Sequence, residues 1–270
     1  MNRYALAGAV LLIGGFALLA DAAAQTKFAR ELMASVYQQD TSRDMTLRIT
    51  MQVGSRGGAI QQKKFVLYRL GAPGDSRTLA RFTDPLEMKG VVLLSINRKA
   101  EADRQFIYLP ATQRVRPVAQ RDRAEPFAGS DFTYEDIAER VLDDFTYRYL
   151  KDEDVIEGHK TFKVEATPAA VGLSQYGFTY YWVAQDVPVI LYAELYDKQG
   201  QLLRRYHASQ LKHVSGIWGA RKIEMSLAKG DTKSTFTIDA AHFNTGLSEE
   251  MFKPESLDKL DAFLKKHPSK

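Results

Sequence analysis

Residues 43–53 read RDMTLRITMQV and alternate strictly between polar and apolar side chains. The odd positions from 45 are apolar and the even positions are polar: Met45, Leu47, Ile49, Met51 and Val53 against Asp44, Thr46, Arg48, Thr50 and Gln52. Because successive side chains of a strand point to opposite faces, this period of two predicts a β-strand with one apolar face. The GSRGG segment at 54–58 predicts a turn directly after it.

Further strand patterns follow along the chain at short intervals. They cover residues 63–70, 77–82, 91–97 and 104–109, then 145–150, 161–167, 178–184, 189–197, 202–209, 217–227 and 233–243. About a dozen short strands separated by turns indicate an antiparallel meander that curls into a barrel or half-barrel. Helical patterns are confined to residues 26–39, 131–142 and 256–266, whereas a parallel sheet needs a crossover helix between each strand pair. The sequence therefore predicts a mainly β chain, and without a Pro/Ser-rich linker it predicts one domain.

The first 24 residues have the pattern of a secretory signal peptide. Arg3 is the only charge before the uncharged stretch at 4–20, and small residues follow at 22–24. The apolar run is shorter than the about 20 residues that cross a bilayer, so we expect cleavage after Ala24, with an uncleaved anchor helix as the alternative. The mature chain, residues 25–270, is then expected in the periplasm.

Composition excludes several functional classes. The 270 residues include no cysteine, which rules out disulfides, thiolate metal sites, a thiol nucleophile and a lipid-modified cysteine. Basic side chains number 37 and acidic ones 33, without a run of like charge that would follow a phosphate backbone. A nucleic-acid partner is therefore not expected.

No motif specific for catalysis is present. The histidines lie at 159, 207, 213, 242 and 267, without compact metal-ligand spacing, although a cluster in space stays open. Ser130 lacks the G-x-S-x-G context of a nucleophile elbow, and the acids from Asp131 onward are explained as helix-starting residues. We therefore expect no enzyme, no cofactor and no metal; a hydrolase that uses His207 or Asp131 is the alternative.

Two features need an explanation beyond a plain sheet. The first is the connection after the strand at 104–109, where YLPATQRVRP (108–117) carries Arg114 and Arg116 and FAGSDFTYEDI (127–137) mixes aromatic and acidic residues. Long connections are usually functional or disordered, and aromatic residues argue against disorder; a plain connection to a capped helix is the alternative. The second is that the strand at 178–184 is apolar on both faces. A curved sheet either packs such a face or leaves a lined cavity, and the pattern does not separate the two.

Several segments resemble the outer-membrane lipoprotein-sorting protein family, whose members are LolA-like exported proteins. They are RTLARFTDPLEMKGVVLLSI (77–96), DRQFIYLPATQRVRPV (103–118), FAGSDFTYEDIAER (127–140), FKVEATP (162–168), VPVILYAELYDKQGQLLRRY (187–206), GIWGARKIEM (216–225) and FNTGLSEEMFKPESL (243–257). The resemblance implies an incomplete antiparallel β-barrel, a LolA/LolB-like half-barrel, with a few helices covering its concave face. It also implies a hydrophobic cavity that shelters acyl chains. The longer subfamily is associated with RND/MMPL-type exporters, which implies an inner-membrane transporter as a partner.

The alternation and the resemblance together give an expected cavity lining, with ordinary core as the alternative for each residue. The lining is Met45, Leu47, Ile49, Met51, Phe65, Leu67, Leu79, Leu93, Phe106, Tyr108, Phe178, Tyr180, Trp182, Leu191 and Leu195. A polar mouth or partner contact is expected at Arg114, Arg116, Phe127, Phe132 and Tyr134, because arginine suits phosphate contacts; solvated strand arginines are the alternative.

Two functions fit this fold. The first is a monomeric periplasmic carrier that holds the acyl chains of a lipoprotein or lipid during transport towards the outer membrane. The second is a non-carrier adaptor subunit of an RND/MMPL-type transporter, docked through a sheet edge or residues 127–137. Bound lipid separates the two, because only a carrier retains it.

Overall fold

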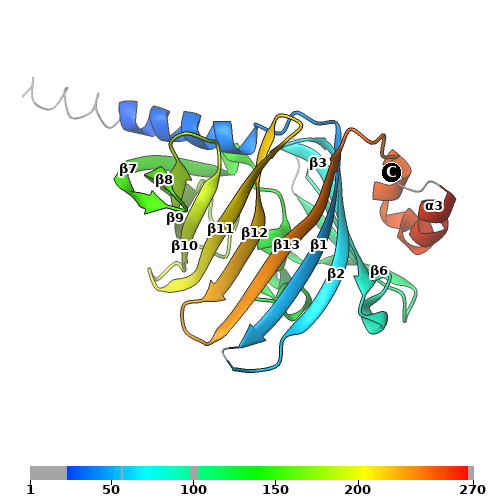
Figure 1. Cartoon of the computed structure of the whole chain (residues 1–270). Coiled ribbons are helices and arrows are strands. Elements are labelled where there is room, and N and C mark those ends of the chain that lie inside the picture. The colour runs from blue at the N-terminus through cyan, green and yellow to red at the C-terminus, as the bar shows by residue number, and fades with distance from the viewer. Residues whose placement is uncertain (1–22, 56, 98–102, 267–270) are drawn as a thin grey trace, which may run out of the picture.

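The computed structural model describes residues 23–55, 57–97 and 103–266, and this part of the chain forms one curved antiparallel sheet (Figure 1). Its strands are β1 (Asp44–Ser55), β2 (Gln61–Ala72), β3 (Asp75–Asp84), β4 (Val92–Ile96), β5 (Arg104–Leu109), β6 (Arg114–Val118), β7 (Phe145–Ile156), β8 (His159–Pro168), β9 (Phe178–Ala184), β10 (Ile190–Tyr196), β11 (Leu202–Val214), β12 (Ile217–Leu227) and β13 (Thr232–Phe243). Each predicted strand overlaps one of these. Most of the expected signal peptide, residues 1–22, lies outside the described residues.

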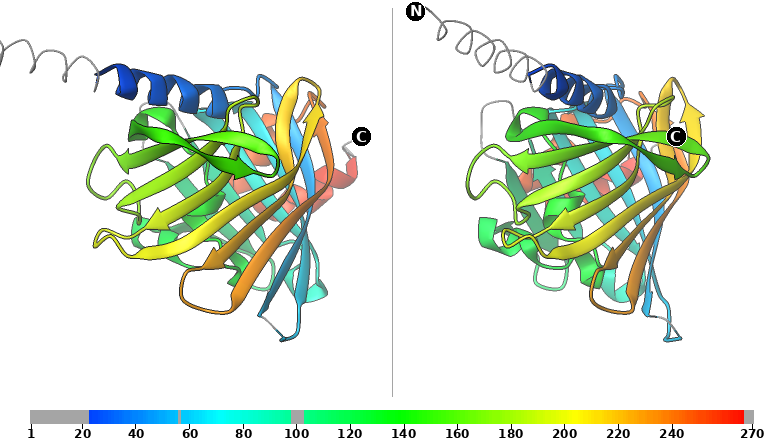
Figure 2. Two further views of the ribbon diagram at one scale, coloured as in Figure 1. Left: turned by 60° about the vertical axis from the view of Figure 1, so that its left-hand side comes forward. Right: turned by 90° about the vertical axis from the view of Figure 1, so that its left-hand side faces the viewer.

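The sheet consists of two meanders that meet at one seam. The spatial order is β6-β5-β4-β3-β2-β1-β13-β12-β11-β10-β9-β8-β7, so β1 pairs with β13 and the edges are β6 and β7. The chain passes from one edge to the other through residues 119–144, which we call the crossover segment. Figure 2 shows the resulting half-barrel, and the predicted incomplete antiparallel barrel is confirmed.

Within the crossover segment, the predicted helix over residues 131–142 is not formed, so that prediction is wrong. Only α2 (Tyr134–Ile137) is α-helical, flanked by short 3-10 turns. A capping box starts it, since Thr133 Oγ1 accepts from the backbone N–H of Asp136 at 3.2 Å and the Asp136 carboxylate accepts from that of Thr133 at 2.8 Å. The helix ends at Ala138, whose backbone is extended. Glu135 and Glu139 accept hydrogen bonds from Gln175 and Gly74, which are distant in sequence, so tertiary contacts override the local pattern.

The N-terminal helix covers part of the concave face. Its described part is residues 23–37, close to the predicted 26–39, and Figure 1 shows it lying across the end of the sheet near β7 and β8. Ala29 and Met33 are fully buried in the main core. Phe28 packs edge-on against Tyr149 and Phe162, with ring centroids 5.3 and 5.2 Å apart. The apolar stripe of this helix therefore packs on the first strands of the second meander.

The C-terminal segment packs on the opposite, convex face, as Figure 1 shows. It comprises two 3-10 turns, Glu249–Phe252 and Pro254–Lys259, and α3 (Leu260–Lys266). Phe252, Leu257 and Leu260 bury the outer side chains of β2 to β5. The sequence predicted a few helices on the concave face, and this segment adds a covering layer on the convex face. In the described parts of the chain, no helix combines the length and apolar character that a bilayer span requires.

Candidate functional site

One end of the concave face is filled by phenylalanine rings, which we call the aromatic cluster. Phe65, Phe82 and Phe236 come from the sheet, and Phe127 and Phe132 come from the crossover segment. The Phe82 and Phe127 ring centroids are 5.6 Å apart, and Phe132 stacks on Phe236 at 4.1 Å. These close ring contacts fill this end of the half-barrel as an ordinary packed core.

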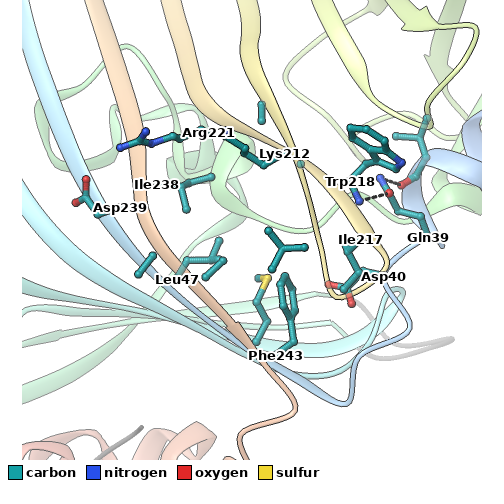
Figure 3. A pocket seen from close by; sticks show the side chains of 17 residues that line it. Gln39, Asp40, Leu47, Lys212, Ile217, Trp218, Arg221, Ile238, Asp239 and Phe243 are labelled. Atoms are coloured by element: carbon teal, nitrogen blue, oxygen red, sulfur yellow. Dashed lines mark hydrogen bonds between the residues drawn. The ribbon is translucent and has the colours of Figure 1, made fainter.

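The other end contains two adjoining cavities. The first has a volume of about 450 Å³ and lies where the N-terminal helix ends, against β1 and β11 to β13 (Figure 3). Its apolar wall is formed by Val36, Met45, Leu47, Val214, Ile217, Trp218, Ala220, Ile238, Ala240, Ala241 and Phe243. Charged side chains also border it: Asp40, Lys212, Arg221 and Asp239. An apolar wall with few polar groups is typical of a ligand site.

Gln39 fixes the helix end beside the first cavity. Its side-chain amide donates to the carbonyl of Pro188 at 2.8 Å, and its Oε1 accepts from the backbone N–H of Trp218 at 3.0 Å. Figure 3 shows the hydrogen bond between Gln39 and Trp218. One side chain thus connects the helix to β12 and to the loop before β10, which holds this wall of the cavity in place.

The second cavity, of about 400 Å³, lies against the crossover segment, the N-terminal helix and β9 to β12. It shares Asp40 and Met45 with the first cavity, so the two adjoin. The rest of its lining is Tyr37, Arg69, Pro73, Phe132, Asp136, Glu139, Arg140, Tyr181, Ile190, Ala193, Leu195, Tyr206 and Met225. Both volumes are within the roughly 300–1,000 Å³ of known ligand pockets.

The second cavity differs from the first in holding phenolic groups beside its charged ones. Arg69 pairs with Asp40 at 2.8 Å. Burial opposes the charge of Arg140, but Tyr181, Tyr37 and nearby carboxylates raise its pKa above the ordinary value. Burial raises the pKa of Tyr37 and of Tyr206. At neutral pH this wall therefore presents a guanidinium and protonated phenols.

The structure brings part of the expected lining together on the concave face: Met45, Leu47, Ile49, Met51, Phe65, Leu67, Leu93 and Leu195. Met45 and Leu47 border the first cavity, and Met45 and Leu195 border the second. By contrast, Ile49, Met51, Phe65 and Leu93 belong to the packed core.

The remaining expected lining residues lie elsewhere. Leu79, Phe106 and Tyr108 are on the convex face beneath the C-terminal segment, Phe178, Tyr180 and Trp182 are on the convex face of β9, and Leu191 belongs to a small cluster with Val187 and Val189. On β9 it is Tyr181 and Val183 that point to the core. Because both faces of that strand are apolar, its alternation did not show which face points inward.

The expected mouth residues lie mostly away from the two cavities. Arg114 and Arg116 are exposed on the edge strand β6 and border neither cavity. Phe127 and Phe132 are only 2% and 4% exposed in the aromatic cluster, and Tyr134 packs on Phe127 with ring centroids 6.1 Å apart. Of this set, only Phe132 lines one of these cavities.

Several cavity residues were not singled out from the sequence. Arg140 ends the FAGSDFTYEDIAER block and reads as a helix-surface arginine, and Tyr37 reads as a core residue of the N-terminal helix. Tyr181 and Tyr206 occupy inward positions on β9 and β11. No single residue in the sequence indicates this cavity. Only the combination of inward-facing tyrosines on the strands with an arginine in the crossover segment could have predicted it.

The groups considered for catalysis have structural partners. His207 lies 3.0 Å from Glu157 and 3.6 Å from Glu224. The Asp131 carboxylate accepts hydrogen bonds from the hydroxyls of Thr232 and Ser234 at 2.6 and 2.7 Å, which attaches the crossover segment to β13. Among residues 23–55, 57–97 and 103–266, no three His, Cys, Asp or Glu side chains form a group that would hold a metal ion.

Comparisons with known proteins agree with this architecture. A protein-family model described as "Uncharacterized protein" matches residues 74–259. The similar solved structures include the following three. A domain from Vibrio parahaemolyticus that carries the name of an outer membrane lipoprotein-sorting protein has a TM-score of 0.80 and 25% identity over 86% of this chain and 99% of that one. A DUF1329 family protein from Desulfovibrio piger has a TM-score of 0.81 and 24% identity, with the same coverage of 86% and 99%.

A LolA superfamily protein from Nitrosomonas europaea has a TM-score of 0.68 and 16% identity over 83% of this chain and 97% of that one. No curated protein matches the chain. The family model covers well over half of the sequence. The chain therefore belongs to the family that this model describes, and its fold is LolA-like.

Proposed function

We propose that the protein is a periplasmic carrier that shelters the acyl chains of a lipid or lipoprotein during transfer towards the outer membrane. The observation that carries this proposal is the pair of adjoining cavities, about 450 and 400 Å³, on the concave face of the half-barrel. The LolA-like fold and the name of the Vibrio parahaemolyticus neighbour support it.

The driving force for such binding is hydrophobic. Moving a hydrocarbon chain out of water gains about 0.8 kcal/mol for each buried CH₂ group. A wall of Leu47, Ile238 and Phe243 beside Trp218 provides the apolar surroundings that this transfer requires. No bond is made or broken, so carriage needs no catalytic group.

We also propose that the protein is exported to the periplasm. Residues 1–24 are proposed to direct export and to be removed, and residues 25–270 to act in the periplasm as a single domain and a monomer. A transporter of the RND/MMPL type is proposed as a partner that delivers or receives the lipid.

The test is lipid retention by the natively purified mature protein. Leu47 is half-buried beside the first cavity, whereas its neighbour Arg48 is exposed on the other face of β1. We expect the wild type and Arg48→Asp to co-purify with stoichiometric lipid, detected by mass spectrometry of an organic extract. Leu47→Asp should co-purify with at least about tenfold less lipid than the wild type, because a charge in an apolar wall opposes burial of the acyl chain.

Leu93, another residue of the expected lining, is a poor site for the same test. It is 3% exposed in the packed core, so we expect Leu93→Asp to unfold the protein. Thermal melts of both β1 variants show whether they remain folded. A wild-type protein that stays free of lipid even after incubation with envelope lipids would contradict the carrier and favour the transporter adaptor.

A further inference from the structure

Arg140 brings a charge to the second cavity without an ionic partner. Among the described residues, its guanidinium has only ring contacts, 5.2 Å from the centroid of Phe145 and 5.8 Å from that of Tyr181. The side chain lines the cavity while keeping only part of its surface accessible. A guanidinium has five N–H donors and keeps its charge, so its donors are available to an acceptor that enters the cavity.

The carboxylates that border the same cavity are occupied by other donors. Asp40 pairs with Arg69 at 2.8 Å, Asp136 accepts from the Tyr176 hydroxyl at 2.9 Å, and Glu139 accepts from the backbone N–H of Gly74 and the hydroxyl of Ser76. Asp136 and the nearby Glu135 support the charge of Arg140 from a distance without forming an ion pair with it. The lining therefore leaves the guanidinium unmatched.

A phenol beside Arg140 also lacks an acceptor. Tyr181 is 5% exposed and lines the cavity, and its hydroxyl interacts with the neighbouring Tyr37 phenol but forms no close hydrogen bond in the described part of the chain. Tyr37 and Tyr206 line the same wall. Protonated phenols and a guanidinium can all donate, and an oxyanion is the group that accepts from both.

We propose that the second cavity binds the anionic group of a single-chain amphiphile, a carboxylate or a phosphate, at Arg140 and the Tyr181 hydroxyl. The hydrocarbon chain then lies against Ala193, Leu195 and Met225 and continues past Met45 into the first cavity. This inference rests on the proposed function as an acyl carrier and adds the chemistry of the headgroup. Charge-assisted hydrogen bonds are roughly twice as strong as neutral ones, so the headgroup gives specificity and the chain gives affinity.

The experiment compares ligands that share one chain. Palmitic acid, palmityl phosphate and palmityl alcohol are titrated into the delipidated mature protein, its Arg140→Gln and Tyr181→Phe variants, and Arg114→Gln. The last variant is the matched control, because Arg114 is an exposed arginine on β6 that borders neither cavity. We expect the wild type and the control to bind at least one anionic ligand about tenfold or more tightly than the alcohol.

Arg140→Gln should lower that anion's affinity to the level of the alcohol, and Tyr181→Phe should lower it by about threefold, with alcohol binding unchanged in both. The preferred anion identifies the headgroup as carboxylate or phosphate. Equal affinity of the wild type for all three ligands would overturn the inference and leave the carrier standing, whereas failure of every ligand would remove the carrier itself.

Loss of alcohol and anion binding together in both folded variants would also overturn the inference, because it would mean that these residues only shape the cavity. If Arg140→Gln does not fold, the preference measured on Tyr181→Phe decides, since that change removes one oxygen without altering the ring.

Discussion

At one end of the concave face Phe127 packs against Phe65 and Phe82, whereas at the other end Met45 and Leu195 border open space. Both ends are made by strands with the same alternation of apolar and polar residues. They differ in what the crossover segment contributes, since it places Phe127 in the filled end, Phe132 between the two ends and Arg140 at the hollow end. An apolar strand face is therefore core or cavity wall according to the segment opposite it.

The convex face shows a similar contrast. Its first half is buried beneath the C-terminal segment. On the second half the rings pack on one another: Phe178 stacks on Tyr196 at 4.6 Å, and the Lys163 ammonium lies 4.3 Å from the ring centroid of Trp182. Cross-strand ring contacts of this kind stabilise a sheet face without a covering layer, which explains why β9 is apolar on both sides.

The largest effect is expected from emptying the filled end. Phe127→Ala removes a ring that is 2% exposed and should lower the free energy of unfolding by about 3–5 kcal/mol, as for other buried phenylalanines. Met45→Ala, in the wall of both cavities, should cost about 2 kcal/mol or less, because the space beside it is already open. Urea unfolding of the two variants measures the difference, and equal losses would contradict the contrast between the ends.

An intermediate effect is expected from adding volume at each end. Ala80 is buried on β3 between Leu67 and Leu93, so Ala80→Leu should overpack the core and cost about 1–3 kcal/mol. Ala193 is equally buried but borders the second cavity, so Ala193→Leu should leave stability unchanged or raise it by about 1 kcal/mol.

The same Ala193→Leu variant should retain less lipid, because its added side chain takes up cavity volume. Thermal unfolding and lipid extraction of this matched pair give the result. Destabilisation of both variants to the same extent would mean that the hollow end is as tightly packed as the filled one.

The smallest effect is expected at the seam that joins the two meanders. Asp44 begins β1, is 3% exposed, and accepts from the backbone N–H groups of Thr245 and Gly246 at 2.7 and 2.9 Å. Burial opposes the charge, but these N–H groups lower the pKa of Asp44 below its ordinary value. Asp44→Asn should therefore cost about 1–2 kcal/mol at neutral pH, since a charge-assisted bond becomes a neutral one.

The sign of the pH dependence follows from this shift. Because the folded state lowers the pKa of Asp44, its contribution is complete above the ordinary pKa of about 3.9 and disappears as the pH falls through the folded value. The wild type and Asp44→Asn should therefore converge in stability in acid. Urea unfolding over that pH range tests this, and a constant gap between the two proteins would exclude a role for the charge.

Local pattern was a good guide to the strands and a poor one to the crossover segment. The bounds of β5, β9 and β12 agree with the prediction, because alternation, turns and flanking residues are properties of the strand itself. The helix expected at 131–142 shrinks to one turn, because Glu135 and Glu139 accept hydrogen bonds from Gln175 and Gly74, which are distant in sequence. No local signal contains those partners.

The sequence by itself determined a mainly antiparallel sheet, the limits of most strands and the existence of apolar faces, since period-two alternation is written into each segment. The tertiary structure decided which of two apolar faces points inward, as for Tyr181 against Trp182, because that choice depends on the curvature of the whole sheet. It also decided where the half-barrel is filled and where Arg140 faces a cavity. Both outcomes depend on the course of the crossover segment between the two edge strands. That course is set by contacts with residues distant in sequence, so no periodic pattern of side chains predicts it.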